Sequence, residues 1–516
     1  MRHPLRSGAV ALWLSASLCA LANPAAAAVW SDKVDPWVLD QTALAPSGES
    51  EFLIVLAEQA DLSGAAGLST KLAKGTYVFE RLRATAARTQ APLLAALADA
   101  GVVHRPFWIA NLIWAKGNAG VIAALAVRAD VAGIAANPRV ASPAAAVGDP
   151  FAASSSPESV EWNIALVHAP AVWALGYSGQ GAVVAGQDTG YRWDHAALKG
   201  KYRGWNGAVA DHNFNWHDAI HSGGGSCGAN ASAPCDDHGH GTHTMGTMVG
   251  DDGIGNQVGM APGARWIGCR NMNVGDGTPA TYTECWQWFL APTDLADQNP
   301  NPAQAPDVIN NSWGCPLSEG CDTNAINAMQ LVVESVRSAG IVPVVSAGNS
   351  GSSCSSVDTP AAIYDAALSV GATDASDGIA SFSSRGPVSV DGSDRRKPDI
   401  SAPGDNIRSS TRDGLYQGGW SGTSMAGPHV AGLVALLLSA DPLLAGNVDR
   451  IEQIIEQSAF HPTTSTQVCG GVAANLFPNN TFGFGRIDAL AMIQSYILFR
   501  DGFEDSSTDG WSSILP

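Results

Sequence analysis

The apolar positions in the first third of the chain change their period several times, and each change predicts a new element. Residues 51–56 form a short run rich in Ile, Leu and Val that predicts a strand, and residues 74–100 carry helix formers in an amphipathic pattern. The order then repeats, because residues 107–114 have strand character and residues 120–135 are rich in Ala, Val and Ile at helical spacing. Residues 29–150 therefore predict a small α+β domain of β-α-β-α order.

A longer region, residues 159–495, alternates short apolar runs with longer helical stretches. Residues 182–186 form an apolar run of the kind found in buried strands, and residues 421–438 predict a buried central helix. Strands that alternate with helices favour a parallel sheet covered on both faces. The predicted fold class is therefore α/β, with a mostly parallel sheet and the small α+β domain in front of it.

The ends of the chain carry patterns of a different kind. Basic residues at positions 2 and 6 precede an apolar stretch over residues 9–22, and Ala26 to Ala28 offer the small side chains that signal peptidase requires. Residues 1–28 therefore predict a secretory signal peptide, and we expect a secreted, extracellular protein. A periplasmic or surface-attached location is the alternative. No later run was expected to be long and apolar enough to span a membrane.

Two short segments separate or follow the predicted domains. Residues 141–158 are rich in Ala, Ser and Pro, which predicts an exposed linker that a peptidase can cut. Residues 496–516 are acidic and stand apart from the main domain. They fit an export or sorting tail and a frayed end equally well.

Composition and charge narrow the class of partner. The chain has 516 residues, of which 46% are hydrophobic, and a formal net charge of -19. A surface of this sign repels a phosphate backbone, which argues against general nucleic-acid binding. Protein and peptide partners remain open, and we expect a monomer.

Eight of the nine cysteines lie beyond the predicted signal peptide. Export places them in an oxidising compartment, where an even set favours disulfides over metal ligation. Although eight cysteines allow about a hundred connectivities, proximity in the sequence suggests the pairs Cys227 with Cys235, Cys269 with Cys285, Cys315 with Cys321, and Cys354 with Cys469.

A serine at position 424 stands at the start of the predicted central helix, in the run Gly-Thr-Ser-Met-Ala-Gly-Pro-His over residues 422–429. Free N–H groups and the positive end of a helix stabilise negative charge that develops there. We expected Gly422 to let the backbone turn tightly in front of Ser424. A buried helix capped by a small polar residue is the alternative interpretation.

Two further motifs supply partners for that serine. Asp188 ends the apolar run 182–186 and opens an Asp-Thr-Gly turn, so it lies where side chains of a parallel sheet face a ligand crevice. Of His238, His240 and His243, His240 is the predicted general base, since imidazole titrates near neutral pH. The other two histidines are interpreted as structural. Asp-Thr-Gly also occurs in ordinary turns and in aspartic peptidases, although no second copy is present here.

Taken together, these motifs resemble the subtilisin family of serine peptidases, in which they occur in the same chain order. The resemblance implies that Asp188 orients the histidine, His240 is the base and Ser424 the nucleophile. It also implies that Asn349, which follows residues 344–348, donates to the oxyanion, where a role in a turn is the alternative. Residues 291–295 and 305–314 resemble the bacillopeptidase F-like branch of this family.

The resemblance extends to the N-terminal domain and to the cofactors. Residues 29–150 resemble the inhibitory propeptide of such peptidases, which implies a self-processed zymogen whose propeptide acts as intramolecular inhibitor and chaperone. No cofactor is required for the implied chemistry. Structural calcium is common in the family, but no contiguous loop with alternating oxygen ligands identifies its ligands here. Gln187 and Gly427 depart from the commonest family pattern without removing a catalytic group.

An extended peptide substrate is expected to pair with the strand edges that wall the primary pocket. The residues assigned to those walls are Ser312, Trp313, Gly314, Ser346, Ala347 and Gly348. Hydrophobic or broad preference is the expectation. A preference for basic residues is a minor alternative, because Glu319 and Asp322 lie nearby in a predicted disulfide loop.

Rival functions use the same residues differently. The spacing of His238, His240 and His243 resembles a zinc-ligand run of metallo-β-lactamase-fold hydrolases, but Thr242 stands where those enzymes need an acidic residue. An α/β-hydrolase esterase requires Gly-x-Ser-x-Gly, which is absent around Ser424. An inactive secreted binding protein on a peptidase fold is the non-enzymatic alternative. The sequence therefore favours an endopeptidase.

Overall fold

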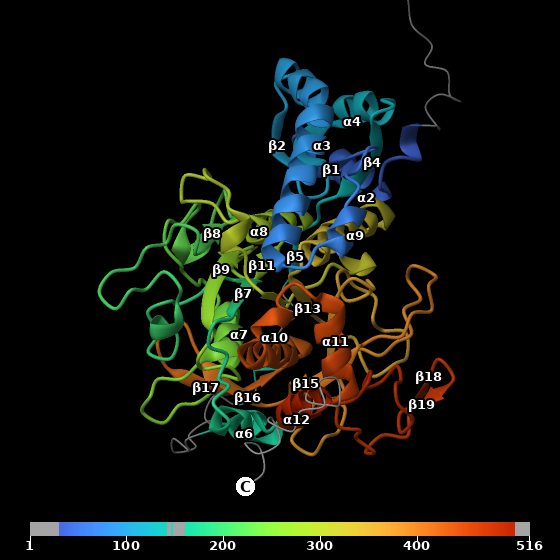
Figure 1. Ribbon diagram of the computed structural model, residues 1–516. Helices are drawn as coiled ribbons and strands as arrows, with labels where there is room; N and C mark the ends of the chain where they lie inside the picture. The colour runs from blue at the N-terminus through green and yellow to red at the C-terminus, as the bar shows by residue number, and fades with distance from the viewer. Residues whose placement is uncertain (1–29, 142–145, 148–159, 501–516) are drawn as a thin grey trace, which may run out of the picture.

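A computed structural model describes residues 30–141, 146–147 and 160–500 of the chain. The predicted signal peptide, most of the predicted linker and residues 501–516 lie outside the described residues. The described part comprises an N-terminal unit over residues 30–141 and a larger α/β unit from residue 160 onward (Figure 1).

Seven parallel strands form the central sheet of the larger unit, which confirms the predicted fold class. Their order across the sheet is β15-β14-β13-β12-β7-β9-β8. The strands are β7 (Val183–Asp188), β8 (Trp216–Asp218), β9 (Arg265–Arg270), β12 (Val308–Asn311), β13 (Val342–Ser346), β14 (Leu368–Thr373) and β15 (Ile400–Pro403). In the middle of the sheet, Val308 is in register with Val184 on one side and with Val342 on the other.

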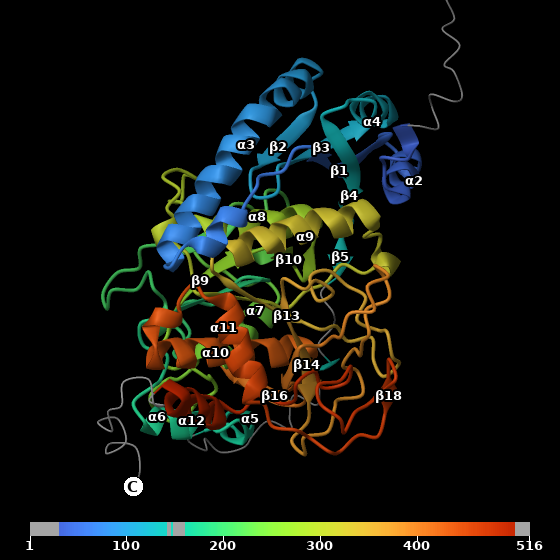
Figure 2. The same ribbon diagram turned by 45° about the vertical axis from the view of Figure 1, so that its right-hand side comes forward.

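Helices cover both faces of this sheet, as buried parallel strands require. Helices α7 (His240–Val249) and α10 (Thr423–Ala440) lie on one face, and α8 (Pro279–Leu290) and α9 (Thr323–Ser338) lie on the other (Figures 1 and 2). Neighbouring residues of one strand serve opposite faces, because Val308 belongs to the core with α10 whereas Ile309 belongs to the core with α8 and α9.

The remaining elements of the larger unit are short and connect or border the sheet. They are α5 (Trp162–Leu166), α6 (Ala169–Ala174), α11 (Val448–Gln457), α12 (Ala489–Arg500), β10 (Met272–Asn273), β11 (Asp276–Gly277), β16 (Ile407–Ser410), β17 (Tyr416–Ser421), β18 (Val468–Cys469) and β19 (Val472–Ala473). All four predicted disulfides are present, so the pairing inferred from proximity is confirmed.

The N-terminal unit is a four-stranded antiparallel sheet with the order β2-β3-β1-β4, packed against the outer side of α8 and α9 (Figure 2). Its elements are α2 (Pro36–Leu44), β1 (Glu49–Leu56), α3 (Lys71–Asp99), β2 (Val103–Phe107), β3 (Leu112–Asn118), α4 (Ala119–Ala126) and β4 (Val131–Ala136). Phe52 and Leu112 of this unit share one hydrophobic cluster with Trp286 and Val332 of α8 and α9. The two units therefore have a common core on this side of the sheet.

The second half of the N-terminal unit differs from the sequence prediction. The strand predicted over 107–114 is a hairpin, in which residues 108–111 form the turn between β2 and β3. Asn111 makes this turn with a φ of 43°, a left-handed conformation that Asn tolerates better than most residues. The helix predicted over 120–135 ends at Ala126, and β4 follows, because a short run of Ala, Val and Ile fits either element until its packing is known.

Two predictions about the C-terminal region also need correction. Helix α10 is long and apolar enough to cross a membrane, contrary to the expectation for this part of the chain, but 89% of its apolar window is buried, so it is the core helix of the larger unit. The boundary predicted at residue 495 falls inside α12, which continues to Arg500. The predicted tail therefore begins within a helix.

Candidate active site

Asp188 is the last residue of β7 and is 1% exposed. Its Oδ1 accepts a hydrogen bond from His240 Nδ1 at 2.7 Å and another from the Thr189 N–H at 2.7 Å. Its Oδ2 accepts a bond from Thr244 Oγ1 at 3.3 Å. Gly241 allows this contact, because a methyl group there would lie 2.2 Å from the carbonyl oxygen of Gly190. The sequence motif thus brings the predicted acid and base together.

Asp236 fixes the N-terminus of α7, and the sequence analysis did not assign it this role. One carboxylate oxygen accepts bonds from the N–H groups of His238 and Gly239, and the other accepts bonds from the N–H and the hydroxyl of Thr242. An acidic residue four positions before the first helical residue is the signal that could have indicated a cap. Asp236 therefore positions His240 rather than a metal.

His240 is the first residue of α7 and is 1% exposed. Burial lowers the pKa of its imidazole, but the charge and hydrogen bond of Asp188, with a contribution from Asp236, outweigh burial and leave the pKa above its ordinary value. The bond to Asp188 occupies Nδ1 and leaves Nε2 for a substrate-side partner. The ring is held in the orientation that a general base requires.

Ser424 is the second residue of α10 and is 1% exposed. Its Oγ and His240 Nε2 are both buried and have no hydrogen-bond partner among the described residues, so the serine–histidine bond of the predicted triad is not formed here. Such bonds are often long in resting enzymes and tighten with substrate. The tight turn expected at Gly422 is absent, since its φ of 164° and ψ of 158° are extended backbone.

Asn349 lies beside the start of the same helix. Its side-chain oxygen accepts bonds from the N–H and the hydroxyl of Thr423 at 2.9 and 2.8 Å. This contact leaves the amide N–H groups of Asn349 as the donors on the side of Ser424. The arrangement fixes the Asn349 amide next to the N-terminus of α10.

A cavity of about 300 Å³ opens beside Asn349 and Thr423. Of the six residues assigned to the walls of the primary pocket, Trp313, Gly314, Ser346 and Gly348 line it. Ser312 and Ala347 do not, because Ser312 Oγ turns to the carbonyl of Ser424 at 3.2 Å and Ala347 is fully buried. Asp358 and Thr359 also line it, and neither was assigned to this pocket from the sequence.

The histidine cluster does not form a metal site. His243 is fully buried and stacks on Trp420 with ring centroids 4.7 Å apart, and burial lowers the pKa of His243 to about 3. His238 is exposed, and its ring centroid lies 6.5 Å from that of His240. In the described part of the chain, no group of three or more His, Cys, Asp or Glu side chains could hold a metal ion.

Both departures from the common family pattern have a local structural reason. Gln187 is fully buried, and its amide lies within hydrogen-bond distance of the amides of Asn311 and Asn271, at 2.5 and 2.9 Å. A methyl group at Gly427 would lie 2.9 Å from Asn310 Oδ1, so glycine lets α10 approach this asparagine. Neither residue touches the reacting groups.

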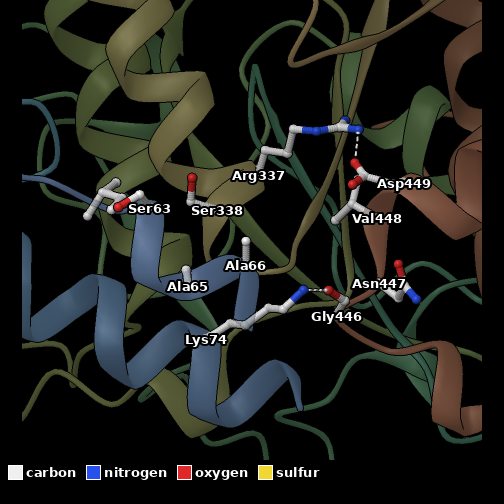
Figure 3. Close-up of a pocket in the computed structure, with 11 residues that line it drawn as sticks. Ser63, Ala65, Ala66, Lys74, Arg337, Ser338, Gly446, Asn447, Val448 and Asp449 are labelled. Atoms are coloured by element: carbon white, nitrogen blue, oxygen red, sulfur yellow. Dashed lines mark hydrogen bonds and ion pairs between the residues drawn. The ribbon is translucent and has the colours of Figure 1, made fainter. Parts of the chain in front are cut away.

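A second pocket lies at the junction of the two units, away from these residues (Figure 3). Lys74 from α3 reaches across it to the carbonyl of Gly446 at 2.8 Å, and Arg337 from α9 pairs with Asp449 at 2.6 Å. Ala65 and Ala66 line its other side. It is a gap in an interface rather than a substrate site, because part of its wall belongs to the N-terminal unit.

A sequence model described as the subtilase family matches residues 179–485, which include Asp188, His240, Asn349 and Ser424. This match covers more than half of the chain. The chain belongs to the subtilase family. Within that family, the chain is similar to the bacillopeptidase F-like branch, as the sequence motifs indicated.

Three curated relatives illustrate the likeness. The chain is 42% identical to bacillopeptidase F of Bacillus subtilis (strain 168) over 346 residues, which are 66% of this chain and 22% of the relative. It is 33% identical to subtilisin DY of Bacillus licheniformis over 293 residues, 56% of this chain and 88% of the relative. It is 33% identical to subtilisin E of Bacillus subtilis (strain 168) over 287 residues, 55% and 62% respectively. The chain thus spans only about a fifth of the first of these subtilases.

Proposed function

We propose that this subtilase is a secreted serine endopeptidase, which forms and hydrolyses an acyl-enzyme through Asp188, His240 and Ser424. The observation that carries the proposal is the buried 2.7 Å bond between Asp188 and His240 at the end of a parallel strand, beside the helix that begins at Thr423. A histidine fixed by a buried carboxylate near a serine at a helix N-terminus suits nucleophilic catalysis. No other chemistry in the described residues uses these three groups.

In the proposed mechanism, His240 Nε2 takes the proton of Ser424 Oγ while the oxygen attacks the carbonyl carbon of the substrate. The negative charge of Asp188 stabilises the imidazolium that results. His240 then returns the proton to the leaving amine, and water repeats the sequence to release the acid. The chemistry needs no cofactor.

The oxyanion of the tetrahedral intermediate is assigned to the Asn349 side chain and the Ser424 N–H. Ser424 is within the first turn of α10, where backbone N–H groups have no partner inside the helix. The bonds from Thr423 hold the Asn349 amide plane in place before substrate binds. Donors fixed in advance cost no reorganisation in the transition state.

The N-terminal unit is proposed to be an inhibitory propeptide that also templates folding. Val140 and Ala141 pair as a strand with Asp276 and Gly277, and residues 146–147 pair with Trp420 and Ser421, just ahead of the serine helix. The described strands on both sides of residues 142–145 therefore pair with segments of the larger unit in the way that an extended substrate pairs with a strand edge. We propose that maturation cuts within the linker over residues 141–158.

Charged contacts support the propeptide assignment. Lys71 of α3 pairs with Asp307 at 2.6 Å, and Arg105 of β2 pairs with Glu284 of α8. The Asp35 carboxylate accepts the N–H groups of Asn324 and Ala325 at the start of α9, at 3.0 and 3.2 Å. These contacts hold the N-terminal unit over the two helices and align its last residues with the active site.

Secretion through the predicted signal peptide fits the four disulfides, which persist in an oxidising compartment. Proteins and peptides are the proposed substrates, and the propeptide is the proposed intramolecular partner of a monomer. No calcium ligand set is assigned, because no described cluster fits one.

Fluorophosphonate labelling tests the proposal. The matured protein should form an adduct on Ser424, whereas Ser424→Ala should remain unlabelled and uncut at the linker. Casein cleavage by the parent should resist a zinc chelator. Cleavage that survives in Ser424→Ala at the parent rate, or that the chelator abolishes, would overturn the proposal.

A further inference from the structure

The cavity beside Asn349 contains negative charge that the described structure does not neutralise. Asp358 and Glu319 are its only ionisable lining residues, and neither forms an ion pair with a described Lys, Arg or His. Asp358 is half-buried on one wall, and Glu319 is exposed at the rim. Arg139, which precedes the lining residues Val140 and Ala141, pairs with Asp276.

The same cavity is lined by buried side chains whose polar atoms have no hydrogen-bond partner among the described residues. Ser346 lines the cavity and is 4% exposed, and its Oγ has no hydrogen-bond partner among the described residues. Trp313, 2% exposed on the adjoining wall, has an unpartnered Nε1 and stacks on Tyr282 with centroids 3.8 Å apart. Buried hydroxyl groups are normally satisfied, so an unsatisfied one in a cavity indicates a ligand.

Local packing fixes the acidic wall. Thr359 Oγ1 accepts the Cys315 N–H at 2.5 Å, and a methyl group at Gly314 would lie 2.4 Å from the same oxygen. Thr359 therefore packs directly against the segment of Trp313 and Gly314, and Asp358, the residue before it, lines the same cavity as the indole. The disulfide between Cys315 and Cys321 holds the loop that carries Glu319.

We propose that this cavity receives a lysine or arginine side chain immediately before the scissile bond, with Asp358 as the specificity-determining residue and Glu319 as a secondary contact at the rim. The inference rests on the proposed endopeptidase function and revises the hydrophobic or broad preference expected from the sequence. The long aliphatic stem of such a residue packs on the Trp313 wall, and its cationic head pairs with Asp358 and donates to Ser346 Oγ.

Other side chains fit less well. A phenylalanine or leucine would bury Asp358 without a cation, and an unpaired charge is costly to remove from water. Burial already raises the pKa of Asp358, and burial and Asp276 raise the pKa of Glu319 despite a hydrogen bond from the Ala141 backbone. A cation in the cavity removes this penalty. An acidic side chain would be repelled.

The predicted linker lacks the kind of residue that the cavity is proposed to receive. Residues 141–158 contain no Lys or Arg, and Val140 and Ala141 present small side chains to the cavity. A tethered segment reacts at high effective concentration, so its own cut does not depend on filling the pocket. Peptides that copy the linker are expected to be poor substrates for the free enzyme.

The test uses matured protein and a series of peptide p-nitroanilides, succinyl-Ala-Ala-Pro-X, in which X is Arg, Lys, Phe or Leu. The Arg and Lys substrates should have kcat/KM values at least about tenfold above Phe and Leu. Asp358→Asn should lower the Arg and Lys values by about 10- to 100-fold and change the Phe value by less than about threefold. Glu319→Gln should lower the Arg value by about two- to fivefold, since an exposed charge is screened.

Asp322→Asn is the matched control. Asp322 belongs to the same acidic stretch but accepts the Thr323 N–H at 2.9 Å as the cap of α9, and it does not line the cavity. Asn is an equally good cap, so this variant should match the parent on every substrate. Benzamidine, a cationic probe, should inhibit the parent at least about tenfold more strongly than Asp358→Asn.

Equal or better cleavage of the Phe substrate by the parent, or an unchanged Arg-to-Phe ratio in Asp358→Asn, would overturn the inference. Fluorophosphonate labelling of Ser424 in each variant separates the two proposals. Labelled protein that prefers Phe refutes only the basic preference, whereas parent protein that stays unlabelled and inactive refutes the peptidase function itself.

Discussion

The close contact between α7 and the end of β7 yields a quantitative prediction for Gly241→Ala. The added methyl group would lie 2.2 Å from the Gly190 carbonyl oxygen and 3.0 Å from Asp188 Cβ. Carbon and oxygen atoms in contact keep about 3.3 Å apart, so the helix must move away by roughly 1 Å. The 2.7 Å bond between Asp188 and His240 lies across the same contact and would lengthen with it.

A displacement of this size at reacting groups costs about 10²-fold in rate, and overpacking a core costs about 1–3 kcal/mol in the free energy of unfolding. Both quantities can be measured on the same variant, by kcat/KM on a peptide p-nitroanilide and by urea unfolding in a Ser424→Ala background. Gly200→Ala is the control, because a methyl group there meets no atom within 4 Å. A kcat/KM for Gly241→Ala within about threefold of the parent would refute this reasoning.

Two further predictions concern charge. His240 must be neutral to act as a base, and Asp188 holds its pKa above the ordinary value, so kcat/KM should fall as the pH drops through that raised pKa. Asp188→Asn should move this acidic limb of the pH–rate profile to lower pH and should lower kcat by about 10⁴-fold. A pH–rate profile in which the limb stays in place would contradict this assignment. Burial raises the pKa of Glu284. The hydrogen bonds to His217 and His221 and the charge of Arg105 outweigh burial and lower this pKa to about 2. Glu284 therefore stabilises the folded protein by about 3 kcal/mol when the pH is above the ordinary pKa of the carboxyl group, and this contribution should be lost as the pH falls from about 4.5 to about 2. Urea unfolding of Glu284→Gln against the parent should show a difference at pH 7 that vanishes near pH 2, and a difference independent of pH would count against the mechanism.

The parts of the molecule that the sequence predicted well depend on local chemistry. Asp188, His240 and Ser424 stand in short motifs that predict a strand end and two helix starts. The structure places Asp188 at the end of β7, His240 at the start of α7 and Ser424 at the start of α10. Three of the four disulfides close loops of 6 to 16 residues, in which proximity along the chain leaves few alternatives.

The missed features depend on contacts between distant segments. Asp358 follows a Ser-rich loop with no periodicity, and only folding brings it into the same cavity as Trp313. The role of Asp236 as the cap of α7 was missed because the sequence does not show that its two oxygens accept hydrogen bonds from the first turn of this helix. The hairpin at Asn111 was missed because residues 108–110 of its turn are apolar and continue the apolar pattern of β3.

The hydrophobic cluster that the N-terminal unit shares with α8 and α9 has a consequence for the proposed maturation. While the linker is intact, the two surfaces meet at an effective concentration set by the tether, so dilution has no effect on their association. Once the linker is cut, the same association becomes bimolecular and follows mass action. If the N-terminal unit is the propeptide proposed above, a freshly cut complex should therefore stay inhibited in a small volume and dissociate on dilution into a large one, so that dilution sets when the enzyme becomes active.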